Sequence, residues 1–440
     1  MSQEWGSRVR TFEDVACTVC GCVCDDLSLR VDGSQIHSVT GACHLSESWF
    51  LNQDSKQPPE ASIGGHPSSF DSAIEKAADI LANSRWPLIY GLSRSSTDGQ
   101  RAAVRLADVI AGNVDTTASL CHGPSIMAIQ EAGESTCSLG EIRNRADFVV
   151  FWGVDPVNTH PRHFERYSVE PTGQFIPNGR KDRTVVVIDS QRTESAELAD
   201  IFLQVPDDRH FEVAWTIRGL LRGIQPAATS KIPVDLETLT SLADQMKQCR
   251  CGVFFFGLGL ARQKSGHRDV EAVLRLTRDL NAHTRFHARR MRMHGDVTGA
   301  DTVLCWQTGF PFAVNLTRGY PRYNPGEFTA NEMLERGEAD ACLLVGGESL
   351  PEMSDAAVRH LNQIPTILLD HPTVEQHFQP TVHFTTSVYG IHLPGTAYRM
   401  DEVPIPLRPV MPQRYASDED VLKAIAERVK NFQPARHLTS

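Results

Sequence analysis

The chain has 440 residues, of which 41% are hydrophobic, and a formal net charge of −11. At roughly 150 residues per domain, this length allows about three domains with sizeable cores. An acidic chain without a basic stripe argues against nucleic-acid binding, and no apolar run approaches the ~20 residues that cross a membrane. Eleven cysteines, with an N-terminus that lacks the apolar core of a secretory signal, favour a reducing cytoplasmic location.

Four cysteines near the N-terminus form the most informative motif. Cys17, Cys20 and Cys24 have the spacing Cys-x2-Cys-x3-Cys, and Cys43 follows after eighteen residues. Three thiolates on one short loop can bind three corners of a four-iron cluster, and a distant fourth can complete the ligand set. A zinc site, which more often pairs two Cys-x2-Cys knuckles, and unmetallated thiols remain alternatives. Cys22, a fifth thiol in this loop, is interpreted as a bystander.

Two sets of segments follow with the same order of apolar strand, glycine loop and helix. A stretch rich in Pro, Ser and Gly, residues 53–69, predicts a linker before them. Residues 86–113 match 251–281, residues 146–156 match 339–349, and residues 184–206 match 365–387. Continuous apolar strands that alternate with amphipathic helices predict parallel sheets covered by helices on both faces.

We therefore expect an α/β protein in which a small iron–sulfur module precedes two duplicated, doubly wound α/β domains. The expected ranges are 1–60 for the module, 61–215 and 216–390 for the two α/β domains, and 391–440 for a C-terminal closing segment. Ligands bind such sheets at the carboxyl ends of the strands, near helix N-termini that favour phosphates. The duplication thus predicts two nucleotide-like ligands, or one in a pseudo-twofold cleft, unless it serves packing alone.

A cysteine module followed by two α/β domains resembles the molybdopterin oxidoreductase family. Five strings narrow the resemblance to the B subunit of formylmethanofuran dehydrogenase, whose bacterial relatives belong to a formyltransferase/hydrolase complex. These strings are SLCHGPS (119–125), FWGVDPVNTHPRHFERYS (151–168), MRMHGDVTGAD (291–301), TGFPFAVNLTRGYPRYNPGEF (308–328) and GTAYRMDEVP (395–404). The resemblance covers nearly the whole chain. It implies molybdopterin oxidoreductase-like domains I–III, one-carbon metabolism, and partner subunits A, C and D.

The resemblance also implies a redox site. A tungsten or molybdenum ion held by two pterin guanine dinucleotides would interconvert formate and carbon dioxide, with electrons passing through the 4Fe-4S cluster. Cys121 matches the thiolate that ligates the metal, and soft sulfur ligands suit such an ion. His122 and Arg292 match polar residues beside the metal. There an imidazole can carry a proton near neutral pH, and a guanidinium can hold a carboxylate in a fork.

Four further residues match loops that would hold the dinucleotide arms, namely Gly153, Asp155, Pro156 and Asp189. Plainer interpretations exist for the site as well. Cys121 alone is more often a small buried residue, Arg292 is usually a surface charge, and residues 160–163 can be a solvated loop.

Two departures from the family pattern leave a second function open. The basic residue that commonly follows the last cluster cysteine is replaced by His44, and the Asp-Pro-Arg pattern of a pterin loop reads Asp-Ser-Gln-Arg at residues 189–192. Both departures suit a non-catalytic structural subunit of a formyltransferase/hydrolase complex with a relict metal site. Large molybdopterin enzymes have a further domain that caps the pterins. We expect this chain to be too short to contain it, so the resemblance implies that the C subunit supplies it.

Overall fold

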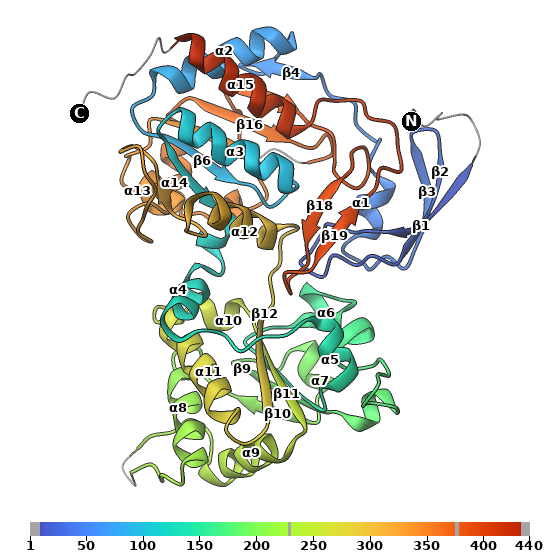
Figure 1. Cartoon of the computed structure of the whole chain (residues 1–440), viewed down its shortest axis with the longest axis vertical. Coiled ribbons are helices and arrows are strands. Elements are labelled where there is room, and N and C mark those ends of the chain that lie inside the picture. Colours follow the sequence, from blue (N-terminus) through green and yellow to red (C-terminus); the bar gives the residue numbers. More distant parts are fainter. Residues whose placement is uncertain (1–8, 228–229, 375–377, 433–440) are drawn as a thin grey trace. The chain divides into compact units, whose positions relative to one another are not determined.

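The computed structural model describes residues 9–227, 230–374 and 378–432 (Figure 1). The outermost residues of the predicted iron–sulfur module and closing segment, 1–8 and 433–440, lie outside the described residues. The chain forms two compact units. Unit 1 comprises residues 1–120, 294–399 and 404–440, and unit 2 comprises residues 121–293 and 400–403.

The units are nested, which differs from the contiguous ranges 61–215 and 216–390 that the sequence predicts. Unit 2 is inserted into unit 1 because the later strands return to the sheet that begins before residue 120. Ala341 of a late strand, for example, lies opposite Pro87 of an early one. Which sheet a strand joins is a long-range property, so the hydrophobic pattern of one segment does not specify it.

A three-stranded antiparallel sheet begins the described chain. Its strands are β1 (Arg10–Val15), β2 (Leu27–Asp32) and β3 (Gln35–Thr40), in that order across the sheet. Leu27, Leu29 and Val31 alternate inward along β2 and are buried, as expected for a strand with one covered face. The short helix α1 (Glu47–Leu51) packs against β3. The loop between β1 and β2 carries the first cysteines of the motif.

The main sheet of unit 1 has nine strands in the order β14-β13-β7-β6-β15-β16-β17-β4-β5. The five central strands are parallel and the outer ones pair antiparallel. The strands are β4 (Ala61–Ile63), β5 (His66–Ser68), β6 (Pro87–Gly91), β7 (Asn113–Thr116), β13 (Val314–Asn315), β14 (Arg322–Tyr323), β15 (Ala341–Val345), β16 (Thr366–Asp370) and β17 (Val382–Thr385). A separate antiparallel pair, β18 (Gly395–Tyr398) and β19 (Pro404–Leu407), completes the strands of this unit.

Helices cover both faces of this sheet, as the continuous apolar strands predict. Along β6, Ile89 joins one apolar core, whereas Leu88 and Tyr90 join another on the opposite face. The first face carries α2 (Phe70–Asn83), α3 (Thr97–Val109), α12 (Val297–Thr308) and α15 (Asp418–Phe432), of which α2, α3 and α15 lie together in Figure 1. The second face carries α13 (Ala330–Glu335) and α14 (Asp355–Leu361).

The sheet of unit 2 has five parallel strands in the order β10-β9-β8-β11-β12. They are β8 (Phe148–Trp152), β9 (Thr184–Asp189), β10 (Ile201–Gln204), β11 (Cys251–Phe256) and β12 (Arg285–Arg290). One face packs on α4 (Gly123–Ala132), α8 (His210–Leu221), α9 (Leu236–Gln248) and α11 (Gly266–Leu280). Shorter helices are α5 (Leu139–Arg145), α6 (Pro156–Thr159), α7 (Glu194–Glu197) and α10 (Leu258–Ala261). No helix in the described residues is long and apolar enough to cross a membrane.

The two parallel sheets repeat one topology. The order β7-β6-β15-β16-β17 in unit 1 corresponds strand by strand to β12-β11-β8-β9-β10 in unit 2. A backbone hydrogen bond recurs with it: Gly153 N donates to Ile188 O at 2.8 Å, and Gly346 N donates to Leu369 O at 2.9 Å. The pairs of segments matched in the sequence therefore take equivalent places. Each sheet, however, combines strands of both repeats. The parallel part of the unit 1 sheet contains β6 and β7 of the first repeat and β15, β16 and β17 of the second. The unit 2 sheet contains β11 and β12 of the second repeat and β8, β9 and β10 of the first.

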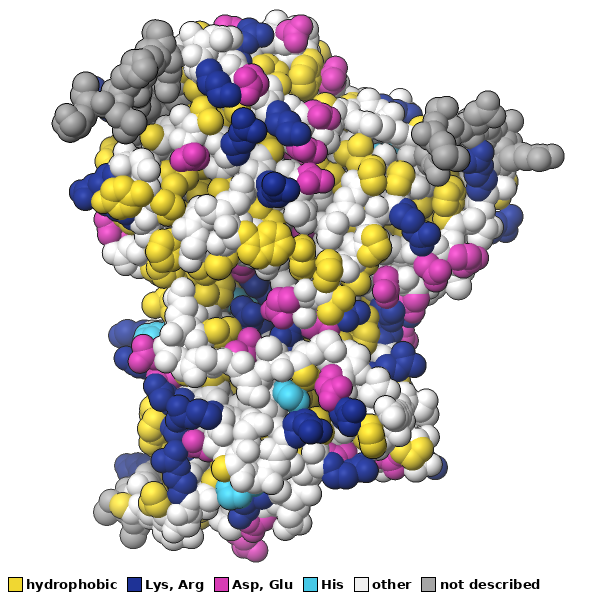
Figure 2. Space-filling model, viewed as in Figure 1, with side chains coloured by type: hydrophobic (Ala, Val, Ile, Leu, Met, Phe, Trp, Pro, Cys, Tyr) yellow, Lys and Arg dark blue, Asp and Glu magenta, His cyan; other side chains and the backbone are white. Residues whose placement is uncertain are grey.

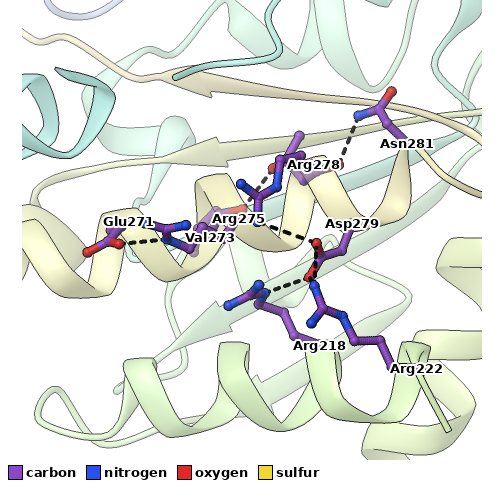
Figure 3. Close-up of polar contacts among 9 residues, drawn as sticks. Arg218, Arg222, Glu271, Val273, Arg275, Arg278, Asp279 and Asn281 are labelled. Carbon is purple, nitrogen blue, oxygen red and sulfur yellow. Dashed lines mark hydrogen bonds and ion pairs between the residues drawn. The ribbon is translucent and has the colours of Figure 1, made fainter. Parts of the chain in front are cut away.

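An ion-pair network joins α8 to α11 within unit 2 (Figure 3). Arg218 Nε lies 2.8 Å from Asp279 Oδ2, and Arg222 Nη2 lies 3.0 Å from Asp279 Oδ1. On the same helix as Asp279, Arg275 contacts Glu271 at 2.6 Å, four residues apart, which is the spacing at which side chains on a helix meet. The contacts of Asp279 therefore join the two helices to each other.

Candidate functional site

The loop between β1 and β2 folds back on itself and brings its cysteines together. Cys17 N donates to Cys24 O at 2.8 Å, and Val23 N donates to Cys20 O at 3.1 Å. Val23 has a positive φ of 37°, a conformation that β-branched residues rarely adopt. Such strain is kept only where the surroundings impose it, which is typical of functional loops.

Cys43 lies close enough to this loop to act on its thiols. Burial raises the pKa of Cys17 well above its ordinary value, and the nearby thiols of Cys20, Cys24 and Cys43 raise it further. Four thiols that lie close enough for three of them to act on Cys17 form a donor set that suits iron, because a bound cation would offset the charge of thiolates gathered in one place. No described cysteine forms a disulfide. The described residues also contain no ready-made group of three or more His, Cys, Asp or Glu metal ligands, so the cluster stays a prediction.

Cys22 is more closely involved than the sequence suggests. Its side chain is buried and hydrogen bonds with the thiols of Cys20 and Cys24, contacts that raise its pKa together with burial. The fifth thiol thus supports two of the predicted ligands instead of standing apart from them.

The Cys121–His122 turn follows β7 and leads into α4, of which His122 is the N-cap. Cys121 is 6% exposed and His122 is fully buried. The His122 imidazole contacts Ser125 Oγ through Nδ1 at 3.0 Å and Met291 O through Nε2 at 3.1 Å. Both ring nitrogens are therefore engaged by the protein.

Arg292 lies beside this turn, in the loop that follows β12, and is only 1% exposed. Burial lowers the pKa of His122 well below its usual range, and the charges of Arg292 and Arg290 lower it further. The structure therefore brings His122 and Arg292 together, and it contradicts the interpretation of Arg292 as a surface charge. The role of His122 as a proton carrier stays a prediction.

Two buried histidines in the segment 160–163 were not expected. His160 and His163 are fully buried, so the interpretation of this segment as a solvated loop is wrong. His160 Nε2 lies 2.7 Å from Arg292 O, and burial lowers the pKa of His160 to about 4. His163 packs among aromatic rings and contacts Ser168 Oγ at 2.9 Å. A buried histidine leaves no periodic signal in a loop, which is why the sequence does not reveal this contact.

The predicted dinucleotide residues lie together at the carboxyl ends of β8 and β9. Gly153 has a φ of 60°, and a Cβ there would lie 2.7 Å from Leu260 N, so the close approach requires glycine. Asp155 accepts a hydrogen bond from Ser195 N at 3.1 Å, and Pro156 begins α6. Burial raises the pKa of Asp189, and Asp155 contributes to the rise, which places the two carboxyl groups near each other.

Unit 1 carries an equivalent loop pair that the sequence motifs leave unassigned. Gly346, with a φ of 84°, stands in the place of Gly153, and Glu348 and Asp370 stand in the places of Asp155 and Asp189. Both acidic side chains of unit 1 are at least 95% buried. The matches of residues 146–156 to 339–349 and of residues 184–206 to 365–387 were the available signals for this second pair.

Arg94 connects these two acidic residues beside the cysteine loop. Its guanidinium lies 3.4 Å from Glu348 Oε2 and 3.3 Å from Asp370 Oδ1. A cavity of about 100 Å³ opens here, lined in part by Thr18 and Val19 of the cysteine loop. This volume suits a few water molecules, so the cavity in this structure would take only part of a larger ligand.

Comparisons with known proteins identify relatives of the whole chain and a solved structure with the same fold. No protein-family model matches the chain. It is 36% identical to the B subunit of tungsten-containing formylmethanofuran dehydrogenase 2 of Methanocaldococcus jannaschii over 445 aligned residues, which cover 96% of this chain and all of the relative. The corresponding protein of Methanococcus maripaludis is 34% identical and covers 97% of this chain, again over the relative's full length.

Two further matches come from Methylorubrum extorquens. The B subunit of the formyltransferase/hydrolase complex Fhc is 27% identical over 66% of this chain and 74% of the relative. A chain in the crystal structure of the FhcABCD complex with methylofuran has the same fold, with a TM-score of 0.70, 22% identity and coverage of 84% of this chain and 99% of that one. Since the similarity to the two methanogen proteins spans the whole length of each, the chain belongs to the family of formylmethanofuran dehydrogenase B subunits.

Proposed function

We propose that this chain is the redox subunit of a formylmethanofuran dehydrogenase-type assembly in one-carbon metabolism, and that it interconverts formate and carbon dioxide. One observation carries the proposal. The Cys121–His122 turn and Arg292 are buried side by side in a chain that matches tungsten-containing relatives over their full length. The proposed cofactors are a tungsten or molybdenum bis(pterin guanine dinucleotide) and a 4Fe-4S cluster.

The residues of the chain fit these groups by their chemistry. Cys121 offers a buried soft ligand for the metal, which would supply the two-electron exchange between formate and carbon dioxide. The carboxyl ends of parallel strands are where dinucleotides bind in α/β sheets. One arm would lie on Gly153, Asp155, Pro156 and Asp189, and the other on Gly346, Glu348 and Asp370. The cluster would be held by Cys17, Cys20, Cys24 and Cys43.

Arg292 is the residue that would recognise the substrate. A buried guanidinium can donate two parallel hydrogen bonds to the carboxylate of formate and offset its charge. Burial makes this interaction stronger than it would be in water, because the local dielectric constant is lower. His122 would hold the loop by donating to Met291 O, and it is engaged at both nitrogens, so its proposed role is orientation.

Partner subunits A, C and D complete the proposal. The structural relative was solved as a complex of four kinds of subunit, and the exposed surface of this chain includes large apolar side chains. In unit 1, Trp306 is 60% exposed and Tyr320 is 53% exposed. Figure 2 shows hydrophobic side chains gathered over the visible face of this unit. Apolar patches of this kind favour a surface that a partner covers.

The test is elemental analysis of the complex purified without oxygen, combined with an assay of formate oxidation by an artificial dye. The proposal predicts tungsten or molybdenum, about four irons per chain, and formate-dependent reduction of the dye. A complex that holds neither metal and reduces no dye would contradict it.

One departure from the molybdopterin family pattern, at the residue after Cys43, favours a second function without redox chemistry. His44 follows the last cluster cysteine and is exposed, where related redox enzymes carry a basic residue between cluster and pterin. In this alternative the chain is a structural subunit of a formyltransferase/hydrolase complex, like the Methylorubrum relative. Formyl hydrolysis by a complex free of tungsten and molybdenum would support this alternative over the redox proposal.

A further inference from the structure

Two buried imidazoles, those of His122 and His160, contact the carbonyl groups of two consecutive residues. The first of these histidines directly follows Cys121, the candidate metal ligand. His122 Nε2 lies 3.1 Å from Met291 O, and His160 Nε2 lies 2.7 Å from Arg292 O. The two histidines come from different elements, the N-cap of α4 and the C-cap of α6. Met291 and Arg292 are each 1% exposed, so water does not compete for these contacts.

The identity of the acceptors fixes the hydrogen positions. A carbonyl oxygen only accepts, so both Nε2 atoms must carry a hydrogen and donate it. The Nδ1 atom of His122 then faces the Ser125 hydroxyl at 3.0 Å, and that of His160 faces the Thr159 hydroxyl at 2.9 Å. The carbonyl oxygen thus fixes the tautomer of each imidazole, and the hydroxyl neighbour can donate to the remaining Nδ1.

His160 also connects Arg292 to the first dinucleotide loop. Its backbone N donates to Pro156 O at 2.8 Å, and the Thr159 hydroxyl lies 2.9 Å from Asp155 O. The single turn of α6 therefore runs directly from Asp155 and Pro156 to the imidazole that holds Arg292.

We propose that His160 is a positioning residue that fixes the backbone of Arg292, and that through α6 it couples the Asp155–Pro156 loop to the placement of the Arg292 guanidinium. The role of Arg292 as the carboxylate-binding group rests on the proposed function. The hydrogen bond between His160 and the Arg292 backbone does not depend on the proposed function, so the positioning role and the substrate role can be tested separately.

The variants are His160→Leu, which removes the donor, and His160→Gln, whose side-chain amide can donate from about the same place as Nε2. His163→Leu is the matched control, since it also removes a fully buried imidazole from the same unit, one that packs among aromatic rings and contacts Ser168. The first readout is the rate at which phenylglyoxal modifies Arg292 in the purified full-length complex, measured by peptide mass spectrometry. The second is the KM and kcat for formate.

We expect His160→Leu to raise the modification rate of Arg292 about tenfold, because Arg292 O would lose its buried partner and the loop its anchor. His160→Gln should stay within about twofold of wild type, as should His163→Leu. In the kinetic assay, His160→Leu should raise KM for formate more than it lowers kcat, with rescue by His160→Gln. An unchanged modification rate in His160→Leu, no rescue by glutamine, or an equal effect of His163→Leu would overturn the proposal.

Failure of the proposed function would give a different experimental result from failure of the positioning role. A wild-type complex without tungsten, molybdenum or formate turnover would refute the redox role. The modification rates of the same preparations would still show whether His160 fixes Arg292.

Discussion

Arg218 and Asp279 form a nearly buried ion pair, 2.8 Å from Nε to Oδ2, between α8 and α11. Their side chains are 9% and 10% exposed. Asp279→Ala should lower the free energy of unfolding by about 1–3 kcal/mol, because a buried guanidinium would lose its charged partner. Chemical denaturation of the purified protein measures this change.

An exposed ion pair provides the control for Asp279. Arg192 and Glu197 are 2.6 Å apart with side chains 57% and 62% exposed, so Glu197→Ala should cost less than about 1 kcal/mol. Burial raises the pKa of Asp279, but hydrogen bonds and charge from Arg218 and Arg222 outweigh it and leave the pKa below its usual range. The stability it contributes is therefore present above the unfolded-state pKa of about 3.9 and is lost as pH falls through the folded-state pKa. Equal losses in both variants would contradict this assignment.

Asp296 should make stability fall as pH rises. It is 1% exposed and accepts hydrogen bonds from Gln100 Nε2, Gly299 N and Tyr398 N, yet burial raises its pKa to about 8. Because the folded state holds the proton more tightly than the unfolded state, stability declines between about pH 4 and pH 8, by at most about 1.4 kcal/mol per pH unit. Asp296→Asn should flatten this part of the profile, as measured by denaturation at pH 5, 6, 7 and 8, and an unchanged slope would count against the assignment.

The cysteine set predicts which thiols hold iron. Cys20→Ser and Cys43→Ser should each lose most of the roughly four irons per chain, because a hydroxyl is a poor ligand for such a cluster. Cys22→Ala is the comparison variant. It removes a thiol that hydrogen bonds with Cys20 and Cys24 but is not itself a predicted ligand, so it should keep most of the iron. Iron analysis and the visible absorption of protein purified without oxygen give the result. Retention of iron in both serine variants would refute the assignment.

If the redox proposal holds, Cys121→Ala should abolish formate-dependent dye reduction and release tungsten or molybdenum, because it would remove the proposed direct ligand of the metal. Arg292→Lys should slow the reaction by about tenfold to a thousandfold, or about 1.4–4 kcal/mol, because an ammonium cannot hold a planar carboxylate in two parallel hydrogen bonds. Formyl hydrolysis by the complex serves as the control for assembly. If both variants match wild type in metal content and dye reduction, the redox proposal is refuted.

The sequence predicts local structure and the duplication well. Apolar runs such as residues 251–256 and 341–345 form fully buried parallel strands, and the strands matched in pairs occupy equivalent places in two sheets. The exchange of strands between the repeats is not predictable in this way, because an apolar strand fits either sheet equally well. Only the pairing of residues far apart, such as Ala341 with Pro87, specifies the nested units.

The candidate site was predictable only in part. The resemblance indicates Cys121, His122 and Arg292, and the structure places the last two together. It does not indicate His160, whose role depends on a carbonyl group contributed by a loop 132 residues away. Every residue has a backbone carbonyl group, so the type of the accepting residue does not reveal that a side chain donates to it. Residue patterns alone therefore miss hydrogen bonds of this kind.

The nesting of the units sets an order for synthesis on the ribosome. All five strands of the unit 2 sheet are available once residue 290 has emerged, so this unit can close while the chain is still growing. Strand β6 must wait for its neighbour β15 until residue 345, with one edge unpaired for more than half the length of the chain. An open edge rich in apolar residues invites association with other chains, so newly made unit 1 should be where misassembly begins and where a chaperone acts. Ribosome-bound chains that are long enough for residue 290 to have left the ribosome, but that stop before β15 is made, would show unit 2 resistant to protease and the residues around β6 still cleavable.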